Sequence, residues 1–296
     1  MRPILRPGLQ ILRRDVNTIQ LGLDWPGVCT LSATPALSAV LEAVDGFRDS
    51  AGVVLAAVET GASRADAQCA LDVLVDCGAL VDQATVWRRS DSEGAWAALW
   101  LLAGPERGAT EVVRGRQGQR VQVRGIGDVA DAVRSVLSLA RVTAAPDGAA
   151  DLVVLASDSE PSRDVADSVM NEGVAHVWVY TREVVGVLGP FVVPGRSGCL
   201  RCADSARSEL DPAWPTLLES AAARPLATPA CDPLLAALLG AWAAQEVAVW
   251  ASGLRPQTWD CVIEVPLGFG SVSSQALGLH PRCGCGWPVW QDTMGA

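Results

Sequence analysis

Over the first 90 residues of the chain, short runs with alternating hydrophobic and polar positions are followed by segments with helical spacing. Short alternating runs, which are typical of half-buried strands, predict strands over residues 9–13, 17–23 and 27–31. Helical spacing with capping residues predicts helices over 34–43, 49–60 and 63–77, with Ser63 as N-cap of the third helix and Gly78 at its end. A two-stranded wing is predicted over 79–82 and 85–87. This order is typical of a winged-helix domain, which we expect over residues 1–90.

A different pattern, in which strands alternate with helices, begins after a polar linker and the helix that follows it. Strands are predicted over 120–124, 141–143, 151–156 and 175–180, and helices over 131–140 and 162–171. One of these strands, 151–156, is apolar almost throughout, as in strands that are covered on both faces. The alternation predicts a doubly wound parallel sheet of the Rossmann type over residues 91–296. The expected fold class is therefore α/β, with two domains.

The most apolar stretch of the chain, residues 233–254, contains Gln245 and Glu246 and is rich in alanine. We expect a buried amphipathic helix there and not a membrane span. The N-terminal segment lacks the apolar run of a signal peptide. The expected compartment is the cytoplasm, where grouped cysteines serve metal binding or catalysis more often than disulfides.

Composition narrows the chemistry, because all 23 basic residues of the 296-residue chain are arginine and none is lysine. A lysine Schiff base and a Walker-A loop are therefore excluded. The formal net charge of −10 also disfavours nucleic acid and anionic membrane surfaces as partners.

The third predicted helix, 63–77, carries one arginine and is otherwise acidic, so it suits DNA poorly. An extended peptide that adds as a strand beside residues 27–31 suits this charge better. The residues expected to contact it are Val28, Cys29, Thr30, Leu31, Arg64, Gln68 and Leu71.

The nine cysteines fall into two sets. Five are scattered, and we expect small core residues at Cys29, Cys69, Cys77, Cys231 and Cys261. The other four form two close pairs on turns, Cys199 with Cys202 and Cys283 with Cys285. Two such pairs, brought together by the fold, make the tetrahedral thiolate site that Zn²⁺ prefers. Since four sulfur ligands leave no position for water, a structural role is expected, and nearby His280 is a weaker candidate ligand.

A glycine turn, Gly125-x-Gly127-x-x-Ala130, follows the strand 120–124 and resembles a nucleotide-binding turn. Asp128 places a negative charge where a phosphate would lie. Asp158, after the strand 151–156, can hold a metal or a ribose, or can serve as an N-cap for the helix near Ser162 or as a loop residue. Gly125, Gly127 and Asp158 are thus the candidate nucleotide-binding residues, although a turn that serves only the fold is the favoured interpretation and ATP is not expected.

Three segments carry a resemblance to a known family: residues 186–202, which end in Gly198-Cys199-Leu200-Arg201-Cys202; residues 211–215; and His280-Pro281-Arg282-Cys283-Gly284-Cys285. Over residues 100–290 the chain resembles the ThiF-like (ubiquitin-activating-type) family, in the branch of bacteriocin-biosynthesis cyclodehydratase proteins that partner YcaO enzymes. The resemblance implies structural zinc on the paired cysteines and a peptide-recognition element at the N-terminus. It further implies a leader peptide held between the third strand and the third helix, a YcaO-type partner and a homodimer.

Two functions from different classes follow. The leading hypothesis is a non-catalytic subunit that binds a leader peptide and docks it to a modifying enzyme. The alternative is an ATP-dependent adenylyltransferase that activates a peptide or protein carboxylate, with Asp158 on Mg²⁺ and Arg124 or Arg182 in place of the missing lysine. A homodimeric scaffold that binds no peptide is a third possibility.

Overall fold

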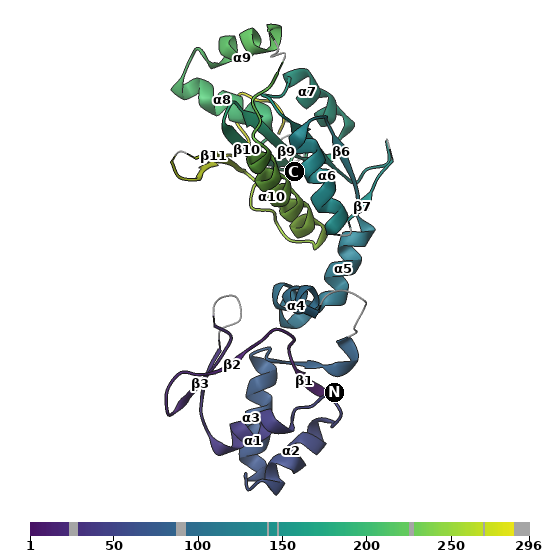
Figure 1. The fold of residues 1–296 in the computed structure, drawn as a ribbon, viewed down its shortest axis with the longest axis vertical. Coiled ribbons are helices and arrows are strands. Elements are labelled where there is room, and N and C mark those ends of the chain that lie inside the picture. Colours follow the sequence, from purple (N-terminus) through teal and green to yellow (C-terminus); the bar gives the residue numbers. More distant parts are fainter. Residues whose placement is uncertain are drawn as a thin grey trace, which may run out of the picture. The chain divides into compact units, whose positions relative to one another are not determined.

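The structure is a computed structural model that describes residues 1–23, 29–86, 93–140, 142–146, 148–224, 228–268 and 270–286. The chain divides into two compact units, Met1–Arg114 and Gly115–Ala296. Each unit has its own hydrophobic core and is described by itself below (Figure 1).

The first unit combines two small antiparallel sheets with a group of helices (Figure 1). Its strands are β1 Pro3–Leu5, β2 Ile11–Arg13, β3 Thr18–Leu21, β4 Cys29–Ser32 and β5 Leu80–Asp82. Its helices are α1 Pro35–Ala43, α2 Ser50–Glu59, α3 Arg64–Asp76, the 3₁₀ turn η1 Gln83–Thr85, α4 Glu93–Arg107 and most of α5 Ala109–Gly118. Leu21, Val40 and Leu74 are fully buried where the β2–β3–β4 sheet and α1–α3 meet.

The helix starts in this unit agree with the capping residues of the sequence. The Thr34 hydroxyl accepts the Leu37 N–H, and the Ser63 hydroxyl accepts the Asp66 N–H, both at 3.1 Å. These bonds satisfy N–H groups that the first helical turn leaves without partners. Gly78, at φ +68°, follows α3 in the left-handed region that glycine tolerates.

The predicted two-stranded wing is wrong in its pairing. β5 pairs with β1, with Pro3 opposite Asp82, whereas residues 83–85 form the turn η1 and residue 87 lies outside the described residues. The Asp82 carboxylate accepts the Ala84 N–H at 3.1 Å and starts the 3₁₀ turn that includes Thr85. A three-residue strand between Arg2 and Arg6 carries little periodicity, so the sequence pattern did not reveal β1.

The first unit also extends beyond the expected domain boundary at residue 90. Trp100 of α4 is 2% exposed and packs with Val81 and Ala109, and Leu101 packs against the core of the unit. The helix that follows the linker therefore belongs with the N-terminal unit.

The second unit is built on a seven-stranded sheet in the order β12-β11-β10-β9-β8-β6-β7. Its strands are β6 Arg120–Arg124, β7 Thr143–Ala144, β8 Leu152–Ser157, β9 Ala175–Arg182, β10 Val185–Val192, β11 Cys261–Pro266 and β12 Ser273–Ala276. The first four are parallel, as predicted, whereas β10, β11 and β12 run antiparallel to their neighbours. The result is a mixed α/β unit, compatible with a Rossmann-like fold.

Helices cover both faces of this sheet (Figure 1). They are α6 Asp128–Leu139, α7 Arg163–Glu172, α8 Leu200–Leu210, α9 Trp214–Ala223 and α10 Pro233–Ala251. One core lies between the sheet and the pair α6 and α10, and the other lies between the sheet and the pair α7 and α8. β8 is buried along most of its length between these two cores, as its apolar sequence predicts.

Helix α10 is long and apolar enough to cross a membrane by length and composition alone. More than half of it is buried inside the second unit, where Leu235, Leu239 and Val247 pack in the core. The prediction of a buried helix is confirmed. It is not amphipathic, however, because Leu234 and Leu238 lie on its exposed side.

Candidate functional site

The glycine turn lies where the order of the parallel strands reverses, between β6 and β8. Ligands of doubly wound sheets bind at the carboxyl ends of the strands at this point. Gly125 and Gly127 have φ values of +129° and +105°, in the region that favours glycine. A Cβ on Gly125 would overlap the Ala156 carbonyl oxygen, and one on Gly127 would overlap the Asp158 carboxylate. The contacts of this turn with Ala156 and Asp158 therefore explain both glycines, and a bound ligand is not needed to explain them.

The Asp158 carboxylate occupies the amino end of α6. Its two oxygens accept the backbone N–H groups of Asp128 at 2.8 Å and Val129 at 2.9 Å. In a nucleotide-binding turn, a phosphate takes this position at the helix N-terminus. Asp158 thus caps α6, through a contact between residues 30 positions apart, whereas the cap expected of it was that of the helix near Ser162.

Cys231 lies beside this carboxylate, although the sequence suggested only a small core residue. The ligand atoms of Asp128, Asp158 and Cys231 all lie within 4.8 Å of one another. Burial, and then the two nearby carboxylates, raise the pKa of Cys231 to about 11. Its thiol therefore remains protonated at neutral pH.

Carboxylates hold each of the two arginines that the adenylyltransferase hypothesis offers in place of lysine. Arg124 donates two hydrogen bonds of 2.7 Å to Glu172. Arg182 pairs with Glu160 at 2.8 Å and with Glu264 at 3.2 Å. A phosphate would have to compete with these carboxylates for either guanidinium.

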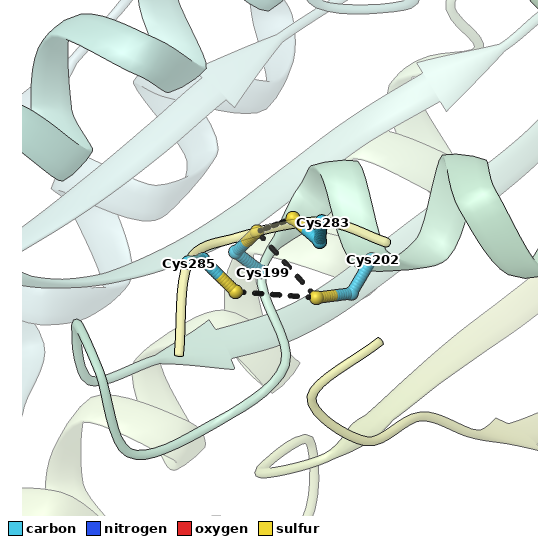
Figure 2. Close-up of side chains that lie close together, drawn as sticks. All are labelled: Cys199, Cys202, Cys283 and Cys285. Atoms are coloured by element: carbon cyan, nitrogen blue, oxygen red, sulfur yellow. Dashed lines mark hydrogen bonds between the residues drawn. The ribbon is translucent and has the colours of Figure 1, made fainter. Parts of the chain in front are cut away.

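The four paired cysteines come together in the second unit (Figure 2). Their sulfur–sulfur distances are 3.8 Å for Cys199–Cys202, 3.5 Å for Cys199–Cys283 and 3.3 Å for Cys202–Cys285. A tetrahedral site with Zn–S bonds of about 2.3 Å has sulfur–sulfur edges of about 3.8 Å. The group can therefore hold a metal ion with small adjustments of its side chains.

Asp260 joins the two segments that carry these cysteines. Its carboxylate accepts the Gly198 N–H at 2.8 Å, and its carbonyl accepts the Leu277 N–H at 2.7 Å. Cys199 and Cys202 lie at the start of α8 and are buried, while Cys283 and Cys285 lie on the later turn and are half-buried. The cluster thus ties the C-terminal segment to the body of the unit.

Within the cluster, the surroundings of the Cys202 sulfur favour negative charge on it. The His280 N–H donates to the Cys202 sulfur at 3.3 Å. Hydrogen bonds from the neighbouring thiols, that of Cys199 first, lower the pKa of Cys202. The His280 ring contacts Glu209 at 3.2 Å and is not part of the cluster.

In the first unit, β4 pairs only with β3 among the described strands. The register places Leu31 opposite Ile19, and the Ala33 N–H donates to the Asn17 carbonyl at 2.7 Å. Because hydrogen-bonded pairs alternate along an antiparallel ladder, the backbone groups of Thr30 point away from β3. This strand therefore presents an open edge to a further strand.

The side chains that were expected to contact a peptide have different surroundings. Thr30 is exposed on β4, whereas Cys29 and Leu31 are half-buried against the core. Arg64 and Gln68 are exposed on α3, and Gln68 donates to Asp72 at 2.8 Å. Leu71 is 2% exposed and packs in the core, so a peptide on the surface would not reach it, and Val28 lies outside the described residues.

No model of a known protein family matches the chain, and no curated protein matches its sequence. Solved structures do share its fold. The crystal structure of E. coli MccB has a TM-score of 0.66 and 14% identity, with 96% of each chain covered. The heterocyclase TruD has a TM-score of 0.71 and 18% identity, and the match covers 96% of this chain and 42% of TruD.

Several of these similar structures have been solved with ligands bound. MccB has been solved with ATP, and with AMPCPP together with MccA. A heterocyclase with a TM-score of 0.71 has been solved with substrate and cofactor. At these identities the similarity shows a shared fold, and the chain spans less than half of the length of TruD.

Proposed function

We propose that this chain is a non-catalytic subunit that binds the leader segment of a ribosomally made peptide and delivers it to a separate modifying enzyme. The observation that carries the proposal is the open edge of β4. An extended peptide can continue the sheet there through main-chain hydrogen bonds. The fold is shared with MccB, solved with MccA, and with a heterocyclase solved with its substrate.

A separate enzyme is part of the proposal because the match to TruD covers only 42% of that heterocyclase. A partner, of the YcaO type by resemblance, would supply the chemistry in trans. The occupied turn at α6 supports this division of labour, because Asp158 already satisfies the N–H groups that would hold a phosphate. Cytoplasmic location and a homodimer are part of the same proposal.

We assign structural zinc to Cys199, Cys202, Cys283 and Cys285. Four thiolates leave no coordination position for water, so the ion would cross-link the start of α8 to the C-terminal turn and would supply no reaction chemistry. The spacing of the four sulfur atoms supports this assignment.

Peptide capture is tested by two proline substitutions on opposite edges of one sheet. Thr30→Pro removes an N–H that points away from β3, and it leaves the β3–β4 ladder intact. Ile11→Pro is the matched control, because the Gly22 N–H donates to Gln10 and places the Ile11 N–H on the outer edge of β2. A labelled peptide, selected against the wild-type chain from a library of random linear peptides, is titrated into both variants.

We expect Thr30→Pro to weaken binding by about tenfold or more, which corresponds to one to two lost main-chain hydrogen bonds. Ile11→Pro should leave the affinity unchanged. Equal affinities of the three proteins would contradict strand addition at β4. If only Ile11→Pro loses affinity for the peptide, the peptide binds at the outer edge of β2 and not at β4.

The adenylyltransferase remains a second candidate because MccB has been solved with ATP at a TM-score of 0.67. Exchange of labelled pyrophosphate into ATP in the presence of the selected peptide discriminates the two functions. We expect no exchange above that of the Asp158→Ala variant.

A further inference from the structure

Arg6 occupies a fixed position at the end of β1. Its N–H donates to the Ala79 carbonyl at 2.8 Å and so continues the β1–β5 ladder by one residue. Its carbonyl accepts the Leu9 N–H at 3.0 Å, which closes a turn with Pro7 and Gly8 in the middle. Gly8 has φ +82°, as the third residue of a type II turn requires. The backbone of Arg6 is therefore held on both sides.

The side chain of Arg6 lies on the face of β1 that α4 covers. Because side chains alternate along a strand, Arg6 shares a face with Ile4, about 6.6 Å away. Ile4 packs in the small cluster that contains Trp100 of α4. On the other side of Arg6, a Cβ on Gly8 would lie 3.1 Å from Ala97 of the same helix, and Trp100 is three residues from Ala97 on the same side of α4. Arg6 and Trp100 are therefore directed into one junction between β1 and α4.

This junction contains two buried hydrogen-bond donors that lack acceptors. Arg6 is 5% exposed and Trp100 is 2% exposed, and neither the Arg6 Nε–H nor the Trp100 Nε1–H has a hydrogen-bond partner. Within the part of the chain that the structure describes, Arg6 also takes part in no ion pair. Buried N–H groups in folded proteins are almost always bonded, and a buried charge is almost always paired. Since both groups donate and neither accepts, the ligand that completes them is an acceptor.

The charge of the junction selects the class of acceptor. Burial lowers the pKa of Arg6, but the ordinary value of arginine is so high that the group stays cationic at neutral pH. A cation favours an anion over a neutral acceptor such as an amide carbonyl. A carboxylate is planar and accepts two parallel hydrogen bonds from a guanidinium, whereas a phosphate would bring more negative charge to a chain whose net charge is already −10. The acceptor that suits this junction is therefore a carboxylate.

We propose that Arg6 and Trp100 form a binding site for one carboxylate group. The guanidinium pairs with the carboxylate and neutralises its charge, and the Trp100 indole N–H donates to one of the carboxylate oxygens. The carboxylate belongs either to a small free acid or to an acidic side chain of the captured peptide, and this second source rests on the proposed function. The site lies in the first unit, whereas the four paired cysteines and the glycine turn lie in the second.

The first arm of the test follows the Trp100 indole N–H by proton–nitrogen correlation NMR while the full chain is titrated with sodium acetate. The resonance is identified by its loss in Trp100→Phe, and the indole of Trp250 in the second unit is the internal control. Sodium chloride at the same ionic strength is the matched salt. We expect acetate, and not chloride, to shift the Trp100 resonance along a curve that saturates. A Trp100 resonance that acetate leaves in place, or that chloride shifts equally, would overturn the proposal.

Two arginine variants separate the Arg6 guanidinium from general effects of charge. Arg6→Gln removes the cation, and Arg64→Gln is the matched control because Arg64 is exposed on α3 of the same unit. We expect the Kd for acetate to rise about tenfold or more in Arg6→Gln and to stay unchanged in Arg64→Gln. Equal effects in the two variants would overturn the role of Arg6. If Arg6→Gln does not fold, Arg6→Lys keeps the charge without the planar fork and should also weaken acetate binding, while the wild-type titration decides the site in any case.

The second arm identifies the source of the carboxylate with the peptide selected for the test of strand addition. Each acidic residue of that peptide is replaced in turn by the corresponding amide. If the peptide supplies the carboxylate, one replacement should weaken binding to the wild type about tenfold and leave binding to Arg6→Gln unchanged. If every replacement affects both proteins equally, the acetate response assigns the site to a free acid. If the chain binds no peptide at all, the proposed function fails, while the acetate titration still decides the carboxylate site.

Discussion

Replacing Asp158 with alanine removes the carboxylate that accepts the N–H groups of Asp128 and Val129 at the start of α6. The loss of an N-cap side chain typically costs ~0.5–2 kcal/mol, and the loss of a negative charge at that end costs ~0.3–1 kcal/mol. Because Asp128 is exposed, water can replace part of the lost bonding. We therefore expect the second unit to lose about 1–2 kcal/mol of unfolding free energy.

The assay is thermal unfolding of the full chain, with inorganic phosphate and ATP as added ligands. A loss of this size lowers the melting temperature of a unit of this length by roughly 2–8 °C. Asp131→Asn is the matched control, since it removes the same charge from the same end of α6 without removing a cap. We expect a change of only a few tenths of a kcal/mol for Asp131→Asn.

Added inorganic phosphate shows whether Asp158 only caps α6 or belongs to a ligand-binding site. With the carboxylate gone, the N–H groups of α6 are available to an anion, so phosphate should raise the melting temperature of Asp158→Ala and not that of the wild type. Two results would refute the reasoning: an Asp158→Ala variant as stable as the wild type, or stabilisation of the wild type by ATP.

Three further predictions concern the second unit. Purified protein should contain about one equivalent of zinc, and Cys283→Ser should lose the metal and expose the C-terminal turn to proteolysis; less than about half an equivalent in the wild type would contradict a structural ion. His176 is 1% exposed, and burial lowers its pKa to about 4. The unfolded state then takes up a proton first, so up to about 3 kcal/mol of stability should be lost as the pH falls from about 6.5 toward 4, and urea titrations of His176→Gln should lack this part of the pH dependence. Glu246, 1% exposed on α10, accepts the N–H groups of Gln257 at 3.2 Å and Thr258 at 2.7 Å. Glu246→Ala should destabilise the unit by about 2–4 kcal/mol in urea unfolding, whereas Gln245→Ala on the exposed side should change it little.

The capping residues and the β6–β9 pattern were predictable because they depend on local chemistry. Ser63 and Thr34 each accept an N–H group only three residues away. The apolar run at β8 indicates by itself a strand that is covered on both faces. The wing was not predictable, because β1 and β5 are almost 80 residues apart and their pairing is a long-range contact.

The sequence by itself determined the spacing of the cysteine pairs, the absence of lysine and the glycine turn. These features depend on residue identity alone. They were enough to predict a metal site of four sulfur ligands and to argue against ATP binding. Only the tertiary structure decided what the same residues contact. It placed Asp158 on the amino end of α6 and Cys231 beside Asp158. Each of these contacts joins residues that are distant along the chain, and no periodicity encodes which of several loops a fold brings together.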